Sequence, residues 1–176
     1  MAKKILLTSF TTWLPHQQTN SSDDLLEKIS QLNYTFAALN FLRQLPVNIL
    51  LASNIVMKKA QVLKPNFIIC CGMAECRQYL SIESNATCNN RTLQTNIALE
   101  KLVGENSRVK ISHDAGKFVC EGLYYSILEW IQRHQLPVNC VFVHVPILTE
   151  QNLNLFLNDF EFILQRLGNY LDETSL

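Results

Sequence analysis

Two runs of apolar residues constrain the fold of this chain most strongly. Residues 66–71 and 139–145 are nearly continuous apolar stretches rich in β-branched and aromatic side chains, and Pro146 ends the second. Strands of this kind are buried on both faces, and segments with helical spacing lie between them. The sequence therefore predicts the α/β class: a single three-layer α/β/α domain over residues 1–176, with a mostly parallel, twisted sheet.

The remaining elements follow from the same periodicity. Further strands are predicted over residues 4–10 and 34–41, and helices over 23–32, 49–63, 119–133 and 153–167. Ser21 or Ser22 is expected to cap the first helix, and Gly168 to end the last. No repeat or low-complexity linker interrupts this alternation.

Composition excludes several classes of function. Fifteen basic and fifteen acidic residues give a formal net charge of zero, and the basic ones are scattered, which argues against a nucleic acid or an anionic membrane as partner. The apolar run at 5–7 is far shorter than an export signal or the about 20 residues of a membrane span. We therefore expect a cytoplasmic protein.

The six cysteines are predicted to be reduced thiols. Cys70 and Cys71 are adjacent in an apolar strand, and Cys140 lies in another. Cys76 and Cys88 have no neighbouring histidine, and no Cys-x-x-Cys occurs, so a structural zinc site is not expected. The sequence predicts neither a metal nor a cofactor.

Cys120 is the candidate nucleophile. It follows the turn at Ala115-Gly116 and lies in the first turn of the helix that begins at Val119. Unpaired backbone N–H groups and the helix dipole favour a thiolate there, so we expect a lowered pKa. The competing interpretation is a buried cysteine that only packs, which is the more common case.

Two polar residues accompany this cysteine. His144 lies near the carboxyl end of the strand at 139–145, the edge of an α/β sheet where ligands bind. Glu83 follows the strand at 66–71 and its turn at Gly72. Each has an ordinary alternative, since His144 can be a core histidine and Glu83 a surface carboxylate.

Their combination resembles the type I pyroglutamyl peptidases, a family of cysteine peptidases. The order Glu, Cys, His matches, as do Ala-Gly-x-[Tyr/Phe]-Val-Cys around Cys120 and His-x-Pro at His144. The resemblance implies that Cys120 is the nucleophile, His144 the base and Glu83 the residue that orients the histidine. It also implies that Phe10 and Trp13 stack on the pyroglutamyl lactam, with Asn20 bracing their loop.

The chain departs from the family's pattern around the substrate. The family turn Gly-Gln-Ala-Gly-Gly-Arg is here residues 72–77, Gly-Met-Ala-Glu-Cys-Arg, so Met73 replaces a lactam-binding glutamine. A thioether cannot donate a hydrogen bond and accepts one only weakly. By resemblance, Arg91 is matched to a family arginine and assigned to the oxyanion. Met73 is assigned to substrate binding.

The predicted function is removal of an N-terminal pyroglutamyl residue from peptides through a thioester acyl-enzyme. Two alternatives stay open: a catalytically silent relative that binds peptides or serves as a subunit, and a cysteine amidase with another acyl substrate. The expected partner is a peptide or small amide substrate, and the wide apolar stripe of the last helix allows a homo-oligomer, a dimer or a tetramer.

Overall fold

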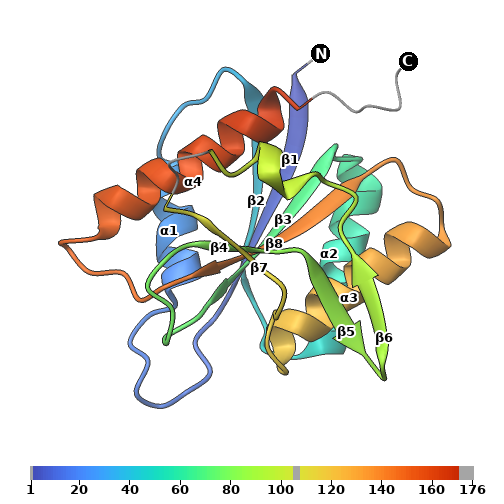
Figure 1. Cartoon of the computed structure of the whole chain (residues 1–176), viewed down its shortest axis with the longest axis horizontal. Coiled ribbons are helices and arrows are strands. Elements are labelled where there is room, and N and C mark those ends of the chain that lie inside the picture. The colour runs from blue at the N-terminus through green and yellow to red at the C-terminus, as the bar shows by residue number, and fades with distance from the viewer. Residues whose placement is uncertain (1, 105–107, 171–176) are drawn as a thin grey trace.

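The computed structural model describes residues 2–104 and 108–170 (Figure 1). Its main sheet has six strands in the order β2-β1-β3-β8-β4-β7. In chain order these are β1 (Lys3–Phe10), β2 (Ala37–Leu45), β3 (Phe67–Met73), β4 (Ser81–Glu83), β7 (Lys110–Ser112) and β8 (Asn139–Val145). The four long strands run parallel, whereas β4 pairs with β8 in the antiparallel sense. A separate hairpin is formed by β5 (Asn85–Cys88) and β6 (Arg91–Gln94).

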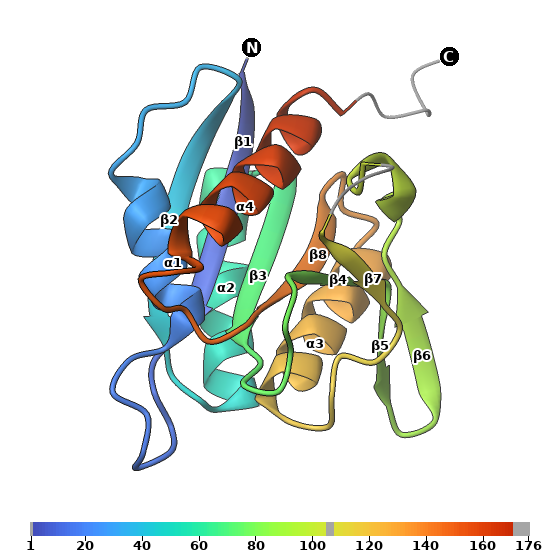
Figure 2. The same ribbon diagram turned by 60° about the vertical axis from the view of Figure 1, so that its left-hand side comes forward.

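Helices cover both faces of this sheet (Figures 1 and 2). The helices are α1 (Ser21–Ser30), α2 (Ile49–Leu63), α3 (Val119–Arg133) and α4 (Leu153–Gly168), with a 3-10 turn at Leu99–Lys101. One hydrophobic core lies under α1 and α4, and a second lies under α2 and α3. The predicted α/β architecture with a mostly parallel sheet between helical layers is confirmed.

Several element boundaries differ from the sequence-based prediction. The strand predicted over 34–41 begins at Ala37 and runs to Leu45. Ahead of it, the Tyr34 hydroxyl donates to Glu161 at 2.8 Å, and the tilted Tyr34 and Phe36 rings contact each other with centroids 5.2 Å apart. The cap of α1 is Asn20 rather than a serine, since the Asn20 side chain accepts from the Ser22 N–H. The helix α4 includes Gly168 and is capped at Asn169.

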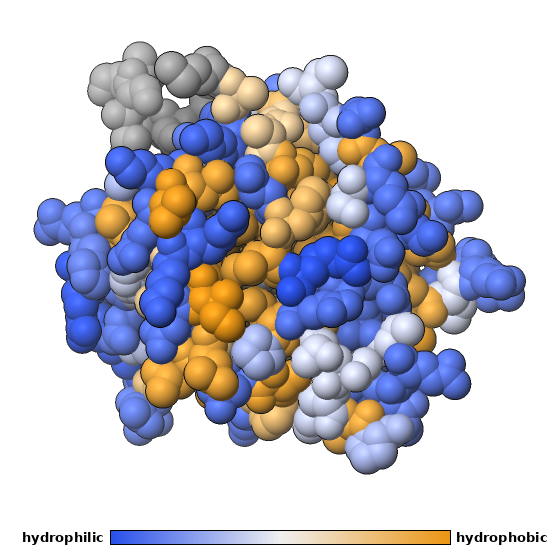
Figure 3. Space-filling view, turned by 180° about the vertical axis from the view of Figure 1, so that it is seen from behind, coloured by the Kyte–Doolittle hydropathy of each residue, from blue (hydrophilic) through white to orange (hydrophobic). Residues whose placement is uncertain are grey.

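The outer surface of α2 is unusually apolar. On the face opposite to the view of Figure 1, apolar side chains emerge between polar ones (Figure 3). In α2, Leu50 is 70% exposed, Leu51 54% and Val62 84%. Within residues 2–104 and 108–170, no helix is long and apolar enough to cross a membrane.

The sheet topology brings the predicted site residues to one edge. The strands β3 and β8 pair in parallel, with Gly72 opposite His144. The strand β4 lies on the other side of β8, with Glu83 opposite Phe142. The carboxyl ends of β1, β3 and β8 lie at the lower end of the molecule in Figure 2, beside the start of α3. Ligands of open α/β sheets bind at this edge.

Candidate active site

The structure places the Cys120 sulfur directly above the sheet. Cys120 is the second residue of α3, and its Sγ lies 2.6 Å from the position that a Cβ on Gly72 would occupy. Residues paired across neighbouring strands point to the same face, so the His144 ring projects on the side where Cys120 lies. Both residues line one pocket.

A buried carboxylate orients the histidine. Glu83 is fully buried, and its Oε1 lies 2.7 Å from His144 Nδ1. An ionised carboxylate only accepts, so the histidine donates Nδ1–H and keeps its Nε2 lone pair. The backbone of Glu83 is held as well, because the buried Tyr124 hydroxyl donates to its carbonyl oxygen at 3.0 Å. Tyr124 lies one turn after Cys120, so it fixes α3 against β4.

Arg77 belongs to this cluster, and sequence reasoning did not assign it a role. Its Nη1 donates to Glu83 Oε1 at 2.5 Å and also to Ser81 Oγ, and its Nη2 donates to the Asp114 carbonyl at 2.8 Å. The guanidinium therefore compensates a buried negative charge and ties the turn after β3 to the turn before α3. The sequence does contain a signal for this role, because Arg77 matches the arginine that ends the family's turn pattern Gly-Gln-Ala-Gly-Gly-Arg.

The expected low pKa of Cys120 is wrong for this structure. Burial, followed by the neighbouring Cys70 and Glu83, raises the pKa of the Cys120 thiol to about 12, and only the Arg77 guanidinium and a backbone hydrogen bond act in the opposite direction. No hydrogen bond joins Cys120 to His144 in the described structure. Burial outweighs the effect of the helix terminus on this pKa, because the sulfur lies against the sheet, over Gly72, beneath the first turn of α3.

The pocket beside Cys120 is small and mainly apolar. Its volume is about 180 Å³, below the roughly 300–1,000 Å³ typical of sites for drug-sized ligands. We call it the cysteine pocket; its lining is Phe10, Trp13, Asn20, Val47, Met73, Ala115, Gly116, Lys117, Phe118, Val119, Cys120 and His144. A pocket of this size accommodates one small ring or acyl group.

Three predicted binding residues are brought together here and one is not. Phe10, Trp13 and Met73 all line the cysteine pocket, and the Met73 sulfur accepts a hydrogen bond of 3.4 Å from the Ser21 N–H. Arg91 instead lies exposed on β6, where it pairs with Glu129 at 3.4 Å. Its assignment to the oxyanion is therefore not supported, because β6 belongs to the separate β5–β6 hairpin and not to the sheet edge that carries His144.

The start of α3 offers donors for a developing oxyanion. Phe118 occupies the N-cap position and makes no capping hydrogen bond, so no side chain at that position satisfies the first N–H groups of the helix. Those groups, at Val119 and Cys120, lie beside the Cys120 sulfur. Asp114 Oδ1 accepts from the Gly116 N–H at 2.9 Å, which stabilises the preceding turn.

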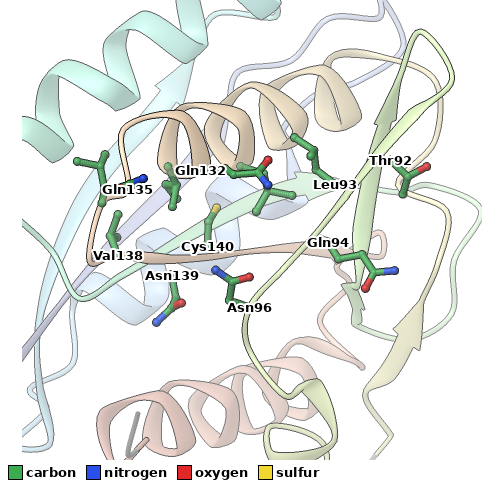
Figure 4. Close-up of a pocket in the computed structure, with 12 residues that line it drawn as sticks. Thr92, Leu93, Gln94, Asn96, Gln132, Gln135, Val138, Asn139 and Cys140 are labelled. Atoms are coloured by element: carbon green, nitrogen blue, oxygen red, sulfur yellow. The ribbon is translucent and has the colours of Figure 1, made fainter. Parts of the chain in front are cut away.

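A hollow larger than the cysteine pocket lies away from Cys120 and His144. It has about 410 Å³ and is bounded by β6 and the C-terminal half of α3 (Figure 4). Figure 4 shows the amide side chains of Gln94, Asn96 and Asn139 around it, and Asn139 begins β8 at the opposite end from His144. None of the predicted site residues lines this hollow. Among the described residues, no group of three or more His, Cys, Asp or Glu is arranged to hold a metal ion.

Comparisons with known proteins find similar peptidases. A family model described as pyroglutamyl peptidase matches residues 92–156, a span that contains Cys120 and His144 but not Glu83. A pyrrolidone-carboxylate peptidase of Brachyspira hyodysenteriae is 30% identical over 118 residues, covering 52% of this chain and 59% of that protein. One from Thermoanaerobacter sp. (strain X514) is 26% identical over 177 residues, covering 86% of each.

The same fold occurs in solved structures. Pyroglutamyl peptidase I of Bacillus amyloliquefaciens superposes with a TM-score of 0.84 over 97% of both chains, at 20% identity. Pyrrolidone carboxyl peptidase of Thermococcus litoralis gives 0.82 over 98% of this chain and 96% of that one, at 18% identity. In the alignments to the first two curated relatives, this chain spans 59% and 64% of their length.

Proposed function

We propose that this chain, a divergent member of the pyroglutamyl peptidase family, is a cysteine peptidase that removes an N-terminal pyroglutamyl residue from peptides. The observation that carries the proposal is the buried Glu83–His144 pair, 2.7 Å apart, at the strand edge where the Cys120 sulfur lies over Gly72. A thiol and a histidine that line one small pocket, with a carboxylate bonded to the histidine, are the components of a cysteine acyl-transfer site.

In the first step His144 acts as general base. Its Nε2 takes the Cys120 proton as the sulfur attacks the acyl carbonyl carbon, so that the nucleophile is generated during the reaction and is not stored as a thiolate. This order follows from the raised pKa of the Cys120 thiol. The N–H groups of Val119 and Cys120 would stabilise the oxyanion. The imidazolium then protonates the leaving amine, the C–N bond breaks and a thioester remains.

In the second step water cleaves the thioester. His144 Nε2 removes a proton from the water as its oxygen attacks the carbonyl carbon, and the C–S bond then breaks with return of the proton to sulfur. Glu83 stabilises the imidazolium in both steps through the Nδ1–H hydrogen bond. Arg77 holds the Glu83 carboxylate in place. Each proton that His144 removes is returned to a product or to sulfur, and no electron is transferred, so this reaction requires no cofactor.

The test is hydrolysis of a fluorogenic pyroglutamyl amide, with the open-chain glutamyl amide as control. We expect release of the fluorophore from the first compound and none from the second, because a charged, open chain does not fit a small apolar pocket. Equal rates, or cleavage of the glutamyl amide alone, would contradict the proposed specificity. Complete inertness would favour the catalytically silent alternative.

One observation favours a second candidate, a cysteine amidase with a more apolar acyl substrate. The Met73 side chain lines the cysteine pocket, and its sulfur is already an acceptor for Ser21 N–H. A lactam N–H and C=O buried against it would lack partners, at a cost of roughly 1–3 kcal/mol for each unpaired group. A panel of small acyl amides decides between the two candidates by relative kcat/KM.

Three broader predictions accompany the proposal. The cytoplasm is the proposed compartment, because all six cysteines are free thiols. Residues 1–176 are proposed to form one domain, since strands from both halves of the chain pair in one six-stranded sheet. The apolar stripe of the last helix, α4, is mostly buried in the core and does not offer the predicted contact surface. A homo-oligomer would instead use the exposed apolar side chains of α2, and sedimentation equilibrium of the wild-type protein and the Leu50→Glu variant tests this.

A further inference from the structure

We propose that Glu75 is a positioning residue that determines substrate affinity: through Gln17, its carboxylate holds Trp13 over the cysteine pocket. The inference deepens the proposed function and rests on it, because it concerns how the same site binds its acyl group. It assigns a role to a side chain that stands where the family turn quoted above has a glycine, which has no side chain to offer.

Glu75 anchors the loop at residues 11–20 to the turn that follows β3. The Gln17 Nε2 donates to Glu75 Oε1 at 2.7 Å, and His16 Nε2 lies 3.1 Å from the same oxygen. These contacts hold the pKa of the Glu75 carboxyl below its usual range, with Gln17 the larger cause. The turn is fixed at its base, since the Ala74 N–H donates to the Val145 carbonyl at 2.9 Å.

Gln17 connects Glu75 to the backbone of Trp13. Its Oε1 accepts from the backbone N–H groups of Trp13, at 3.0 Å, and Leu14, at 3.2 Å. One amide side chain therefore joins the Glu75 carboxylate to the backbone that carries the indole. Near its ends the loop is held by hydrogen bonds from Asn20 Nδ2 to the Thr11 carbonyl and from the Thr11 N–H to the Leu45 carbonyl, and within it the Gln17 N–H donates to the Leu14 carbonyl at 3.0 Å.

Trp13 depends on this tie because little else holds it. The Trp13 side chain is 48% exposed, so the core does not fix it. Its indole packs on Phe118, with ring centroids 4.5 Å apart and planes inclined by 33°. Phe118, itself 52% exposed, immediately precedes α3. The Glu75–Gln17 contact thus fixes one side of an aromatic pair at the edge of the cysteine pocket, and the start of α3 fixes the other.

The experiment compares Glu75→Ala and Gln17→Ala with the wild type in a Trp130→Phe background, where Trp13 is the only tryptophan. Acrylamide quenching and the emission maximum of Trp13 report its position without any substrate. We expect stronger quenching and a red-shifted maximum in both variants. With the pyroglutamyl amide, KM should rise about three- to tenfold while kcat stays within about twofold. Glu27→Ala is the matched control, since it removes an ion-paired carboxylate remote from the pocket.

The double variant separates a shared pathway from two independent effects. Because Glu75 acts on Trp13 through Gln17, Glu75→Ala/Gln17→Ala should be no worse than the more impaired of the two single variants. Additive losses, or unchanged quenching and KM in Glu75→Ala, would overturn the proposal. If the enzyme proved inert toward every amide, the fluorescence result would still decide whether Glu75 positions Trp13. Normal turnover with unchanged fluorescence in Glu75→Ala would refute the role of Glu75 in positioning Trp13, but it would still support the proposed peptidase activity.

Discussion

The Cys120 sulfur occupies the space that a side chain at position 72 would need. A Cβ built on Gly72 would lie 2.6 Å from Cys120 Sγ and 2.9 Å from Phe142 Cζ. Gly72 is also the residue of β3 that pairs with His144. The absence of a side chain at this one position therefore allows α3 to bring its thiol down onto the sheet, next to the histidine.

Replacing this glycine should separate the nucleophile from its base. In Gly72→Ala we expect kcat to fall by at least about a hundredfold, with a loss of about 1–3 kcal/mol in unfolding free energy from overpacking. Steady-state kinetics and urea unfolding measure the two effects. Gly104→Ala is the control, because its Cβ would meet only Phe162 at 3.3 Å, away from the site. Retained activity in Gly72→Ala would refute the placement of the thiol.

Arg77 should support catalysis through Glu83 without contacting the substrate. We expect Arg77→Ala to lower kcat about 10- to 100-fold with KM changed by less than about threefold, and Arg77→Lys to recover part of the loss. Arg91→Ala is a matched control, since it removes an exposed arginine that pairs with Glu129 on the surface. A larger effect of Arg91→Ala than of Arg77→Ala would restore the original assignment of the oxyanion.

The state of the resting thiol can be measured by alkylation. Because the pKa of Cys120 lies at about 12, its thiolate fraction should grow about tenfold per pH unit from pH 6 to 9, and the rate of reaction with iodoacetamide should follow. A background of Cys76→Ser and Cys88→Ser removes the two exposed thiols. N-acetylcysteine, as control, should level off above about pH 8.5. A rate for Cys120 that is flat across neutral pH would instead show a preformed thiolate–imidazolium pair.

Lactam recognition should improve when position 73 regains an amide. Met73→Gln can pair with a lactam group that the thioether leaves unsatisfied, so kcat/KM for a pyroglutamyl amide should rise by about tenfold. Met73→Leu is the control of similar volume, and it should not raise the rate. An unchanged or lower kcat/KM in a correctly folded Met73→Gln protein would mean that lactam recognition is limited elsewhere.

Much of this architecture could be predicted because buried strands consist of nearly continuous apolar residues, a pattern that is recognisable in the sequence. The strands β3 and β8 are covered on both faces, so their apolar runs marked them clearly. Cys120 and His144 stand at a helix start and a strand end, and both positions can be inferred from local pattern. The type of each element was therefore more predictable than its boundaries. The end of β2 was missed because this strand lies at the edge of the sheet and contains the polar residues Asn40, Arg43 and Gln44.

What sequence reasoning missed depends on contacts distant in the chain. The role of Arg77 follows from its reach to Glu83 and to the Asp114 carbonyl, 37 residues away along the chain. Arg91 was misassigned because sequence order after Glu83 does not reveal that the chain turns away into the β5–β6 hairpin. The pKa of Cys120 was mispredicted because the helix terminus is a local property, whereas burial of the sulfur against Gly72 is not.

The most direct test of the central claim is to trap the acyl-enzyme. The protein is mixed with a pyroglutamyl ester, quenched in acid within the first turnover, and mapped by peptide mass spectrometry. We expect one added pyroglutamyl group on the peptide containing Cys120, a longer-lived adduct in His144→Ala, and no adduct in Cys120→Ser. Acylation of another cysteine, or ester hydrolysis that survives in Cys120→Ser, would contradict it.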